Sequence, residues 1–284
     1  MDINLIPTSE ELDNLVSPDD QIVLMSEAAR RAKLEKKGQD KFPIGYSIFN
    51  EVMNGGITAG DLVVISGKSG EGKTTFAQTL TWHINKLSIP QLWFSYEMEI
   101  TEIWEKFETM GVDEFFMGYC PLKIRSGNIE WIERKIVESV LKFNTKVIFI
   151  DHLGFLLPKS DDQNYESMNR NYSVYLGSIA RQLKDIAREK HLIIFLLAHV
   201  RKTRDELTLD DLAHSSGIGQ EADFVFMVER ERQKTKWEKT EGDVYTPFTK
   251  ISLVKNRRTG INKFIRCQLT AGKLTEAVNY EVIG

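Results

Sequence analysis

The 284-residue sequence contains only two cysteines, Cys120 and Cys267, which lie far apart in the chain. This scarcity argues against a disulfide framework or a cysteine-based zinc site and is typical of a reducing compartment. The longest apolar runs have the length of a strand, far below the roughly 20 residues that cross a bilayer. The acidic N-terminus also lacks the basic region and apolar core of a secretory signal. We therefore expect a protein without membrane association, in the cytoplasm or in a viral replication complex within it.

The sequence also lacks an excess of positive charge, with 37 basic and 41 acidic residues and a net charge of −4. This excludes a surface coated with basic groups. It does not exclude a local nucleic-acid site, because the inner channel of a ring needs only a few basic groups from each subunit. We find no internal repeat and no low-complexity tract. A composition of 42% hydrophobic and 27% charged residues is that of a globular protein.

The clearest motif is a glycine-rich loop between an apolar run, Leu62–Ile65, and a helical pattern. The loop reads Gly67-Lys68-Ser69-Gly70-Glu71-Gly72-Lys73-Thr74-Thr75. This is the G-x-x-x-x-G-K-[ST] pattern between a strand and a helix, so it predicts binding of a nucleoside triphosphate. We expect Lys73 to reach the β- and γ-phosphates and the Thr74 hydroxyl to ligate Mg²⁺. The alternative is a chance glycine-rich turn, which the flanking strand and helix make improbable.

Strands alternate with helices along the first two hundred residues. The pattern predicts strands at 91–96, 146–150, 192–198, 223–229, 250–255 and 263–269, and helices at 19–37, 73–87, 100–110, 128–143 and from residue 172. We expect a charged loop near 230–247 and a less regular stretch at 111–127. The fold class is therefore α/β, a mostly parallel central sheet flanked by helices, with antiparallel strands toward the C-terminus.

Polar residues follow three of these strands, at the edge where parallel sheets bind their ligands. Asp151 ends the apolar run Val147–Ile150, and we expect it to bind Mg²⁺; the alternative is an ordinary turn residue. No carboxylate follows Asp151, so the general base is sought after the second strand. We assign it to Glu97, with Glu99 in reserve as an acid that starts a helix. His199 ends the fourth strand and either senses the γ-phosphate or is a surface loop histidine.

Two loops contain basic residues that are able to contact a polyanion. The candidate DNA-binding residues are Lys159, Arg170, Arg201, Lys202, Arg204, Ser216 and Gly217. Acids are interleaved with them, and mixed charge is more often a solvated face. A further basic turn, Lys255–Arg258, follows a late strand. It either projects to the γ-phosphate held by a neighbouring subunit or is a plain hairpin turn.

Together the motifs resemble the RecA-like ATPase domain of hexameric replicative helicases, which include bacterial DnaB, the bacteriophage primase–helicases and mitochondrial Twinkle. The resemblance covers about residues 40–275. It rests on segments in the family's order, namely Thr58–Leu62, Gly67–Thr75, Phe94–Met98, Ile148–Leu153, Leu197–His199, Ser215–Asp223 and Lys255–Arg257. Ala213-His214 departs from the family's usual Arg-Gly or Arg-Glu.

The resemblance implies roles for individual residues. Glu97 would be the catalytic base and His199 the phosphate sensor, Gln220 would couple nucleotide state to a DNA-binding loop, and Arg257 with Lys255 would act on the neighbouring subunit's ATP. The chain would then be a Mg²⁺-dependent ATPase that forms a homo-oligomer, a hexameric ring, moves on single-stranded DNA and unwinds duplex during replication. A primase or polymerase is the further partner that this resemblance implies.

The polar residues 1–18, with Pro7 and Pro18, and the helical pattern over 19–37 also predict a division of the chain. Residues 1–40 would form a flexible arm and a linker helix, and residues 41–284 the motor domain, either an isolated motor or a minimal relative. Two alternatives share the same core: a RecA- or RadA-like recombinase, or a KaiC-like regulatory ATPase. The late Lys-x-Arg turn favours the helicase. An alternative of another class is a nucleotide-binding scaffold without turnover, against which Glu97 argues.

Overall fold

The computed structural model describes residues 22–35, 41–113, 115–125, 128–156, 172–199, 217–233 and 244–277. Contacts within the chain divide it into two units, Met1–Asp40 and Lys41–Gly284. In the first unit the structure describes helix α2 (Met25–Glu35), shorter than the helix predicted over 19–37. Glu27 pairs there with Arg30 and Arg31 on the helix surface. The predicted arm at residues 1–18 lies outside the described residues.

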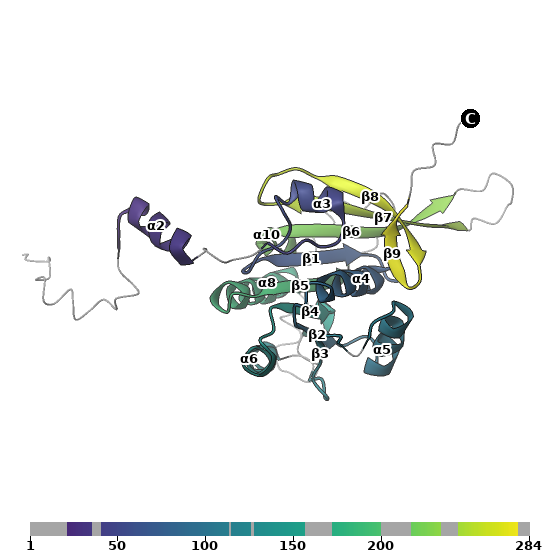
Figure 1. The fold of residues 1–284 in the computed structure, drawn as a ribbon, viewed down its shortest axis with the longest axis horizontal. Coiled ribbons are helices and arrows are strands. Elements are labelled where there is room, and N and C mark those ends of the chain that lie inside the picture. Colours follow the sequence, from purple (N-terminus) through teal and green to yellow (C-terminus); the bar gives the residue numbers. More distant parts are fainter. Residues whose placement is uncertain are drawn as a thin grey trace, which may run out of the picture. The chain divides into compact units, whose positions relative to one another are not determined.

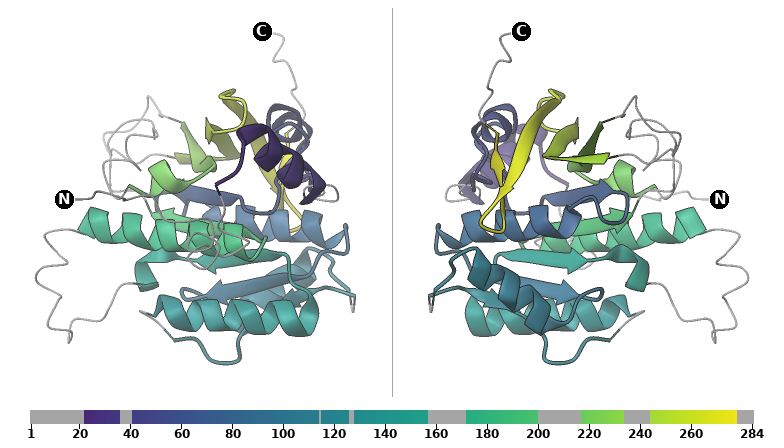
Figure 2. Two further views of the ribbon diagram at one scale, coloured as in Figure 1. Left: turned by 90° about the vertical axis from the view of Figure 1, so that its left-hand side faces the viewer. Right: turned by 90° about the vertical axis from the view of Figure 1, so that its right-hand side faces the viewer.

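A nine-stranded sheet forms the centre of the second unit in the part of the chain that the structure describes, in the order β3-β2-β4-β5-β1-β6-β7-β8-β9 (Figure 1). The strands are β1 (Leu62–Gly67), β2 (Gln91–Ser95), β3 (Gly118–Tyr119), β4 (Val147–Asp151), β5 (Ile193–His199), β6 (Phe224–Gln233), β7 (Val244–Asn256), β8 (Lys263–Thr270) and β9 (Lys273–Glu276). Pairing is parallel from β3 to β6 and antiparallel from β6 to β9. The side views show β7–β9 at the end of the sheet opposite β2 (Figure 2).

Helices cover both faces of this sheet. They are α3 (Ser47–Val52), α4 (Lys73–Asn85), α5 (Ile100–Thr109), α6 (Ile129–Phe143), α8 (Tyr172–Glu189) and α10 (Ile218–Glu221), with a short 3-10 helix η1 (Leu153–Leu156). Alternate side chains of β1 enter two separate cores. Val63 and Ile65 pack with α3, α4 and α5, whereas Leu62 and Val64 pack with α6 and α8. Figure 1 shows α4 and α5 on one side of the strands and α6 and α8 on the other.

A row of aromatic rings sets the register of three central strands. Trp93, Phe149 and Phe195 are paired across β2, β4 and β5 and stack with ring centroids 4.7 and 4.6 Å apart. Each such pair contributes about 0.5–1.5 kcal/mol beyond the area that it buries. The same register places Ser95 beside Asp151, and the pairing of β1 with β5 places Gly67 beside His199. The polar strand ends therefore meet at one edge of the sheet.

The predicted fold class, a mostly parallel sheet with antiparallel strands toward the C-terminus, is confirmed. The prediction of a charged loop near 230–247 is wrong at both ends, because β6 continues to Gln233 and β7 begins at Val244. The charged residues Arg230, Glu231 and Arg232 lie on β6 beyond its buried part, where the side chains are half-buried or exposed. The two short strands β3 and β9 and the one-turn helix α10 were not predicted. Among the helices that the structure describes, none is long and apolar enough to cross a lipid bilayer.

Candidate nucleotide-binding site

The glycine-rich loop joins β1 to α4 and has little room for side chains at its start. A Cβ atom on Gly67 would lie 2.3 Å from the carbonyl oxygen of Val228, so the close approach of the loop to β6 requires glycine. Gly72 is the N-cap of α4 and has a φ of +99°, in the left-handed region that glycine tolerates best. The unpaired N–H groups of the first turn of α4 therefore lie next to the loop, where they attract an anion.

The side chain of Glu71 fixes the loop from behind. It is 2% exposed, and it accepts hydrogen bonds from the backbone N–H of Arg230 and, at 2.7 Å, from the guanidinium of Arg232 on β6. We predicted Glu71 as part of the nucleotide-binding loop. Its carboxylate is engaged with β6, so only its backbone remains available to a phosphate. The motif gives no sign of this anchor, because its partners lie about 160 residues further along the chain.

Lys73 and His199 are in direct contact at the carboxyl edge of the sheet. The Lys73 ammonium donates to the carbonyl oxygen of Lys68 at 2.8 Å and to Nδ1 of His199 at 3.0 Å. On its other side, Nε2 of His199 lies 3.9 Å from a carboxylate oxygen of Glu97. Burial lowers the pKa of Lys73, although the charges of Glu97 and Asp151 oppose this effect. Burial, reinforced by the Lys73 charge, also lowers the pKa of His199.

Thr74 and Asp151 form the second pair of predicted ligands. The Thr74 hydroxyl donates to Oδ2 of Asp151 at 2.8 Å. The Asp151 side chain is 1% exposed, and its Oδ1 atom is buried with no hydrogen-bond partner among the described residues. Burial raises the pKa of Asp151 to about 6. A buried carboxylate oxygen without a partner, next to a threonine hydroxyl, fits a hard cation that takes oxygen ligands, so these residues fit Mg²⁺.

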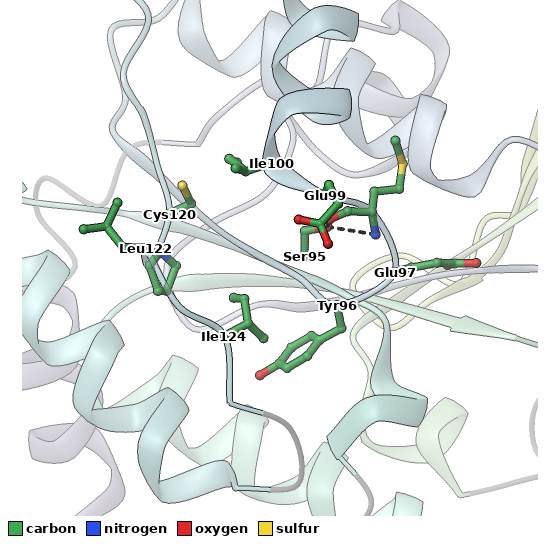
Figure 3. A pocket seen from close by; sticks show the side chains of 10 residues that line it. Ser95, Tyr96, Glu97, Glu99, Ile100, Cys120, Leu122 and Ile124 are labelled. Carbon is green, nitrogen blue, oxygen red and sulfur yellow. Dashed lines mark hydrogen bonds between the residues drawn. The ribbon is translucent and has the colours of Figure 1, made fainter.

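Glu97 follows β2 on a tight turn that the Ser95 hydroxyl closes. This hydroxyl donates to the carbonyl of Met98 at 2.7 Å and accepts from its N–H at 3.3 Å. Beside the turn lies a cavity of about 290 Å³ (Figure 3). Glu97 and Glu99 are both among the residues that line it, and in that view the Glu97 side chain points away from the others. Glu97 is therefore the acid of this pair that reaches His199.

His152 is a member of this group that our sequence analysis did not assign. Its ring lies edge-on to that of His199, with centroids 4.3 Å apart, and its Nδ1 accepts from the N–H of Gly154 at 2.9 Å. Burial lowers the pKa of His152 to about 4. Its position directly after Asp151, at a strand end, was the available signal.

A second cluster contains Lys255, Arg257 and Gln220. Lys255 donates to the carbonyl oxygens of Gly219, at 2.7 Å, and Gln220, at 3.1 Å, and the guanidinium of Arg257 donates to the carbonyl of Gln220. The structure thus joins three predicted residues through the backbone of α10. Gly217 begins this helix with a φ of +61°.

This second cluster lies at the edge of the sheet opposite the phosphate loop. Asn256, between the two basic residues, pairs with Phe224, which pairs with Val63 near the start of β1, whereas the loop follows the end of β1 at Gly67. The other candidate DNA-binding residues, Lys159, Arg170, Arg201, Lys202, Arg204 and Ser216, lie outside the described residues.

Comparison with known proteins agrees with this geometry. Residues 120–271, more than half of the chain, match the model of the DnaB-like helicase C-terminal domain. The chain belongs to that family. Residues 42–115, which include the phosphate loop, match the KaiC ATPase model. The resemblance inferred from the motifs is therefore confirmed.

Individual relatives of this DnaB-like domain are distant. A probable replicative DNA helicase of Trieres chinensis is 24% identical over 239 residues, which cover 71% of this chain and 50% of the relative. The DNA repair protein RadA of Streptococcus pneumoniae is 23% identical over 232 residues, 81% of this chain and 47% of RadA. The chain spans about half the length of the curated relatives it matches.

Two solved structures share the fold. One is a DnaB-like replicative helicase described together with its interactions with primase, with a TM-score of 0.68 and 18% identity, covering 97% of this chain and 73% of that one. The other is an ATPase domain, with a TM-score of 0.69 and 17% identity, covering 91% of this chain and 100% of that domain. The predicted RecA-like arrangement of the sheet is that of these ATPase domains.

Proposed function

We propose that this DnaB-like domain hydrolyses ATP with Mg²⁺ at the contacts between its subunits, and that it uses the energy to move on single-stranded DNA and unwind duplex during replication. The observation that carries the proposal is the meeting of Lys73, Thr74, Asp151, Glu97 and His199 at one edge of the sheet, around the phosphate loop. These are the groups that phosphoryl transfer to water requires.

Each residue of this edge has a distinct task. Lys73 exchanges His199 for the β- and γ-phosphates, and the first-turn N–H groups of α4 bind the same anion. Thr74 and Asp151 hold Mg²⁺, which when bound neutralises charge on the phosphates. Glu97 orients the attacking water and accepts its proton. The Glu97 side chain lies beside His199 on the turn after β2 and is 42% exposed, so water reaches its carboxylate. His199, released by Lys73, is free to contact the γ-phosphate.

The opposite edge supplies the rest of the site to a neighbour. Lys255 and Arg257 lie beside the start of β1, away from the loop of their own chain, and this position supports an action on another subunit's ATP. This supports a homo-oligomer, for which the family resemblance implies a hexameric ring. Both residues hold the carbonyl of Gln220, so a change at the neighbour's phosphate reaches α10.

An unwinding assay tests this function. With a forked DNA substrate, ATP and Mg²⁺, we expect displacement of one strand, and a DNA-stimulated ATPase in the same preparation. Because RadA is among the relatives, a recombinase is the second candidate function. Strand exchange without unwinding would establish that alternative, and ATP binding without turnover would establish a scaffold. Primase, named with one structural neighbour, is the partner to test for stimulation.

A further inference from the structure

Three side chains converge at the carboxyl edge of the sheet, and one of them, His152, has no role in the proposed hydrolysis. Glu97, His152 and His199 each offer one ligand atom, and these three atoms all lie within 4.8 Å of one another. They come from three strand ends, after β2, after β4 and at the end of β5. The alignment of those ends by the aromatic row therefore builds the group from residues that are distant in sequence.

This donor set differs in chemistry from the Thr74–Asp151 pair. Two imidazoles and a carboxylate suit Zn²⁺ and its neighbours among the late first-row metals, whereas Mg²⁺ prefers oxygen ligands and keeps its water. Ligand atoms around a tetrahedral zinc ion lie about 3.4 Å apart, given bonds of about 2.0–2.2 Å. The Glu97–His199 pair is already at 3.9 Å. The half-exposed turn that carries Glu97 allows the remaining closure.

We propose that Glu97, His152 and His199 form a binding site for a zinc-class divalent cation, and that occupancy of this site inhibits the domain. A bound cation would hold the Glu97 carboxylate and one ring nitrogen of His199, so neither would be available to water or phosphate. Binding requires only the three side chains. The inhibition rests on the proposed function, in which these two residues serve hydrolysis.

Lys73 opposes this site. An ammonium group has no lone pair, so it donates to Nδ1 of His199, and the single proton of the neutral ring is then on Nε2, which faces Glu97. For Nε2 to ligate a cation, that proton must move to Nδ1 and Lys73 must leave. His152 likewise accepts a hydrogen bond at Nδ1, so its ring exchanges a backbone contact for the cation. Removal of the Lys73 ammonium should therefore tighten cation binding.

Titration of the full chain with CoCl₂, in the absence of nucleotide, tests the site directly. Co²⁺ replaces Zn²⁺ in such sites, and its visible absorption reports imidazole ligands and low coordination number. We expect intense visible bands that ZnCl₂ abolishes and that a large excess of MgCl₂ leaves in place. His152→Asn should weaken Co²⁺ binding at least tenfold, since even changes to residues that only orient a metal ligand cost about 10–100-fold in metal affinity. Lys73→Ala should strengthen it.

The control for the histidine change is His191→Asn. His191 is exposed and has a φ of +53°, which asparagine tolerates, so this variant should bind Co²⁺ as the parent does. Equal Co²⁺ affinity in His152→Asn and the parent would overturn the site. Displacement of the bands by Mg²⁺ would also overturn it, because the cobalt would then lie at Thr74 and Asp151.

The inhibitory consequence has a separate readout. At saturating Mg²⁺ and ATP, micromolar ZnCl₂ should lower the ATPase rate of the parent and of His191→Asn. The zinc concentration for half inhibition should rise at least about tenfold in His152→Asn, in parallel with its Co²⁺ affinity. Inhibition that is unchanged in His152→Asn would refute this part of the proposal. A chain that binds Co²⁺ as expected but shows no ATPase would instead refute the proposed function.

Discussion

Lys73 and His199, 126 residues apart in sequence, share a hydrogen bond of 3.0 Å between Nζ and Nδ1. We expect Lys73→Ala to abolish ATP hydrolysis and to weaken nucleotide binding at least about tenfold, because charge-assisted hydrogen bonds are worth about 1.5–3 kcal/mol each. The pKa of His199 should rise at the same time, since the ammonium that helps to lower it is gone. Binding of a fluorescent ATP analogue and NMR titration of the histidines measure the two effects. The control is Lys146→Ala, a change at an exposed lysine, and retained turnover in Lys73→Ala would refute the assignment of the loop.

The raised pKa of Asp151 makes its contribution to the stability of the fold depend on pH, in a direction that can be predicted. Burial raises its pKa to about 6 in the folded protein, against an ordinary value of 3.8. The unfolded chain therefore ionises first as the pH rises. This group's contribution to stability is complete below about pH 4 and is lost between pH 4 and 6, by at most about 3 kcal/mol. Asp151→Asn should thus raise the stability of the metal-free protein at pH 8, with little effect at pH 4, while Mg²⁺-dependent hydrolysis is lost.

Urea unfolding in EDTA at the two pH values measures this difference. Asp185→Asn, a change at an exposed acid on α8, serves as the control and should show no such pH-dependent gain. An Asp151→Asn variant that is destabilised equally at both values would contradict the predicted shift.

The contacts of Glu71 with β6 predict that a change of this residue in the phosphate loop lowers the stability of the protein. Glu71→Gln leaves the Arg230 N–H or the Arg232 guanidinium with a poorer acceptor, so we expect a loss of about 1–2 kcal/mol in unfolding free energy and weaker nucleotide binding. The expected loss is small for a buried carboxylate because Arg232 is one-third exposed. Glu105→Gln on the surface of α5 should be neutral. A second change, Arg232→Met, identifies the cause. If Glu71→Gln lowers the unfolding free energy no further in the Arg232→Met protein, the loss comes from the Glu71–Arg232 pair. Fully additive losses would exclude that pair as the cause.

Arg257 tests the sharing of the site between subunits. Arg257→Ala should bind ATP nearly as the parent does, yet lose hydrolysis by a factor of about 10³–10⁵, the range found for arginine fingers. Mixed with Glu97→Gln subunits it should regain activity, because some contacts then combine an intact Glu97 with an intact Arg257. Arg266→Ala, at an exposed arginine of β8, is the control. Absence of rescue, with mixed assembly confirmed by mass, would count against a shared site.

Much of the fold was accessible from the sequence because central parallel strands are buried on both faces and carry continuous apolar runs, such as Ile193–Ala198. The polar residue that ends each run then indicated the edge at which a ligand binds. The rest depended on tertiary contacts. The two-residue strand β3 has no periodicity to detect, and the strand predicted at 250–255 covers only the second half of β7. The contact of Glu71 with β6 and the approach of His152 to His199 follow from register, which no local pattern encodes.

The placement of the phosphate loop and Arg257 at opposite edges of one sheet has a consequence for symmetry. If Arg257 completes a neighbour's site, the two surfaces in contact differ, so the interface is heterologous and a two-fold dimer is unable to satisfy it on both sides. An open row of subunits would always leave one loop without an arginine and one arginine without a loop. Only a closed ring gives every loop its arginine, whereas a helical filament leaves its two ends incomplete.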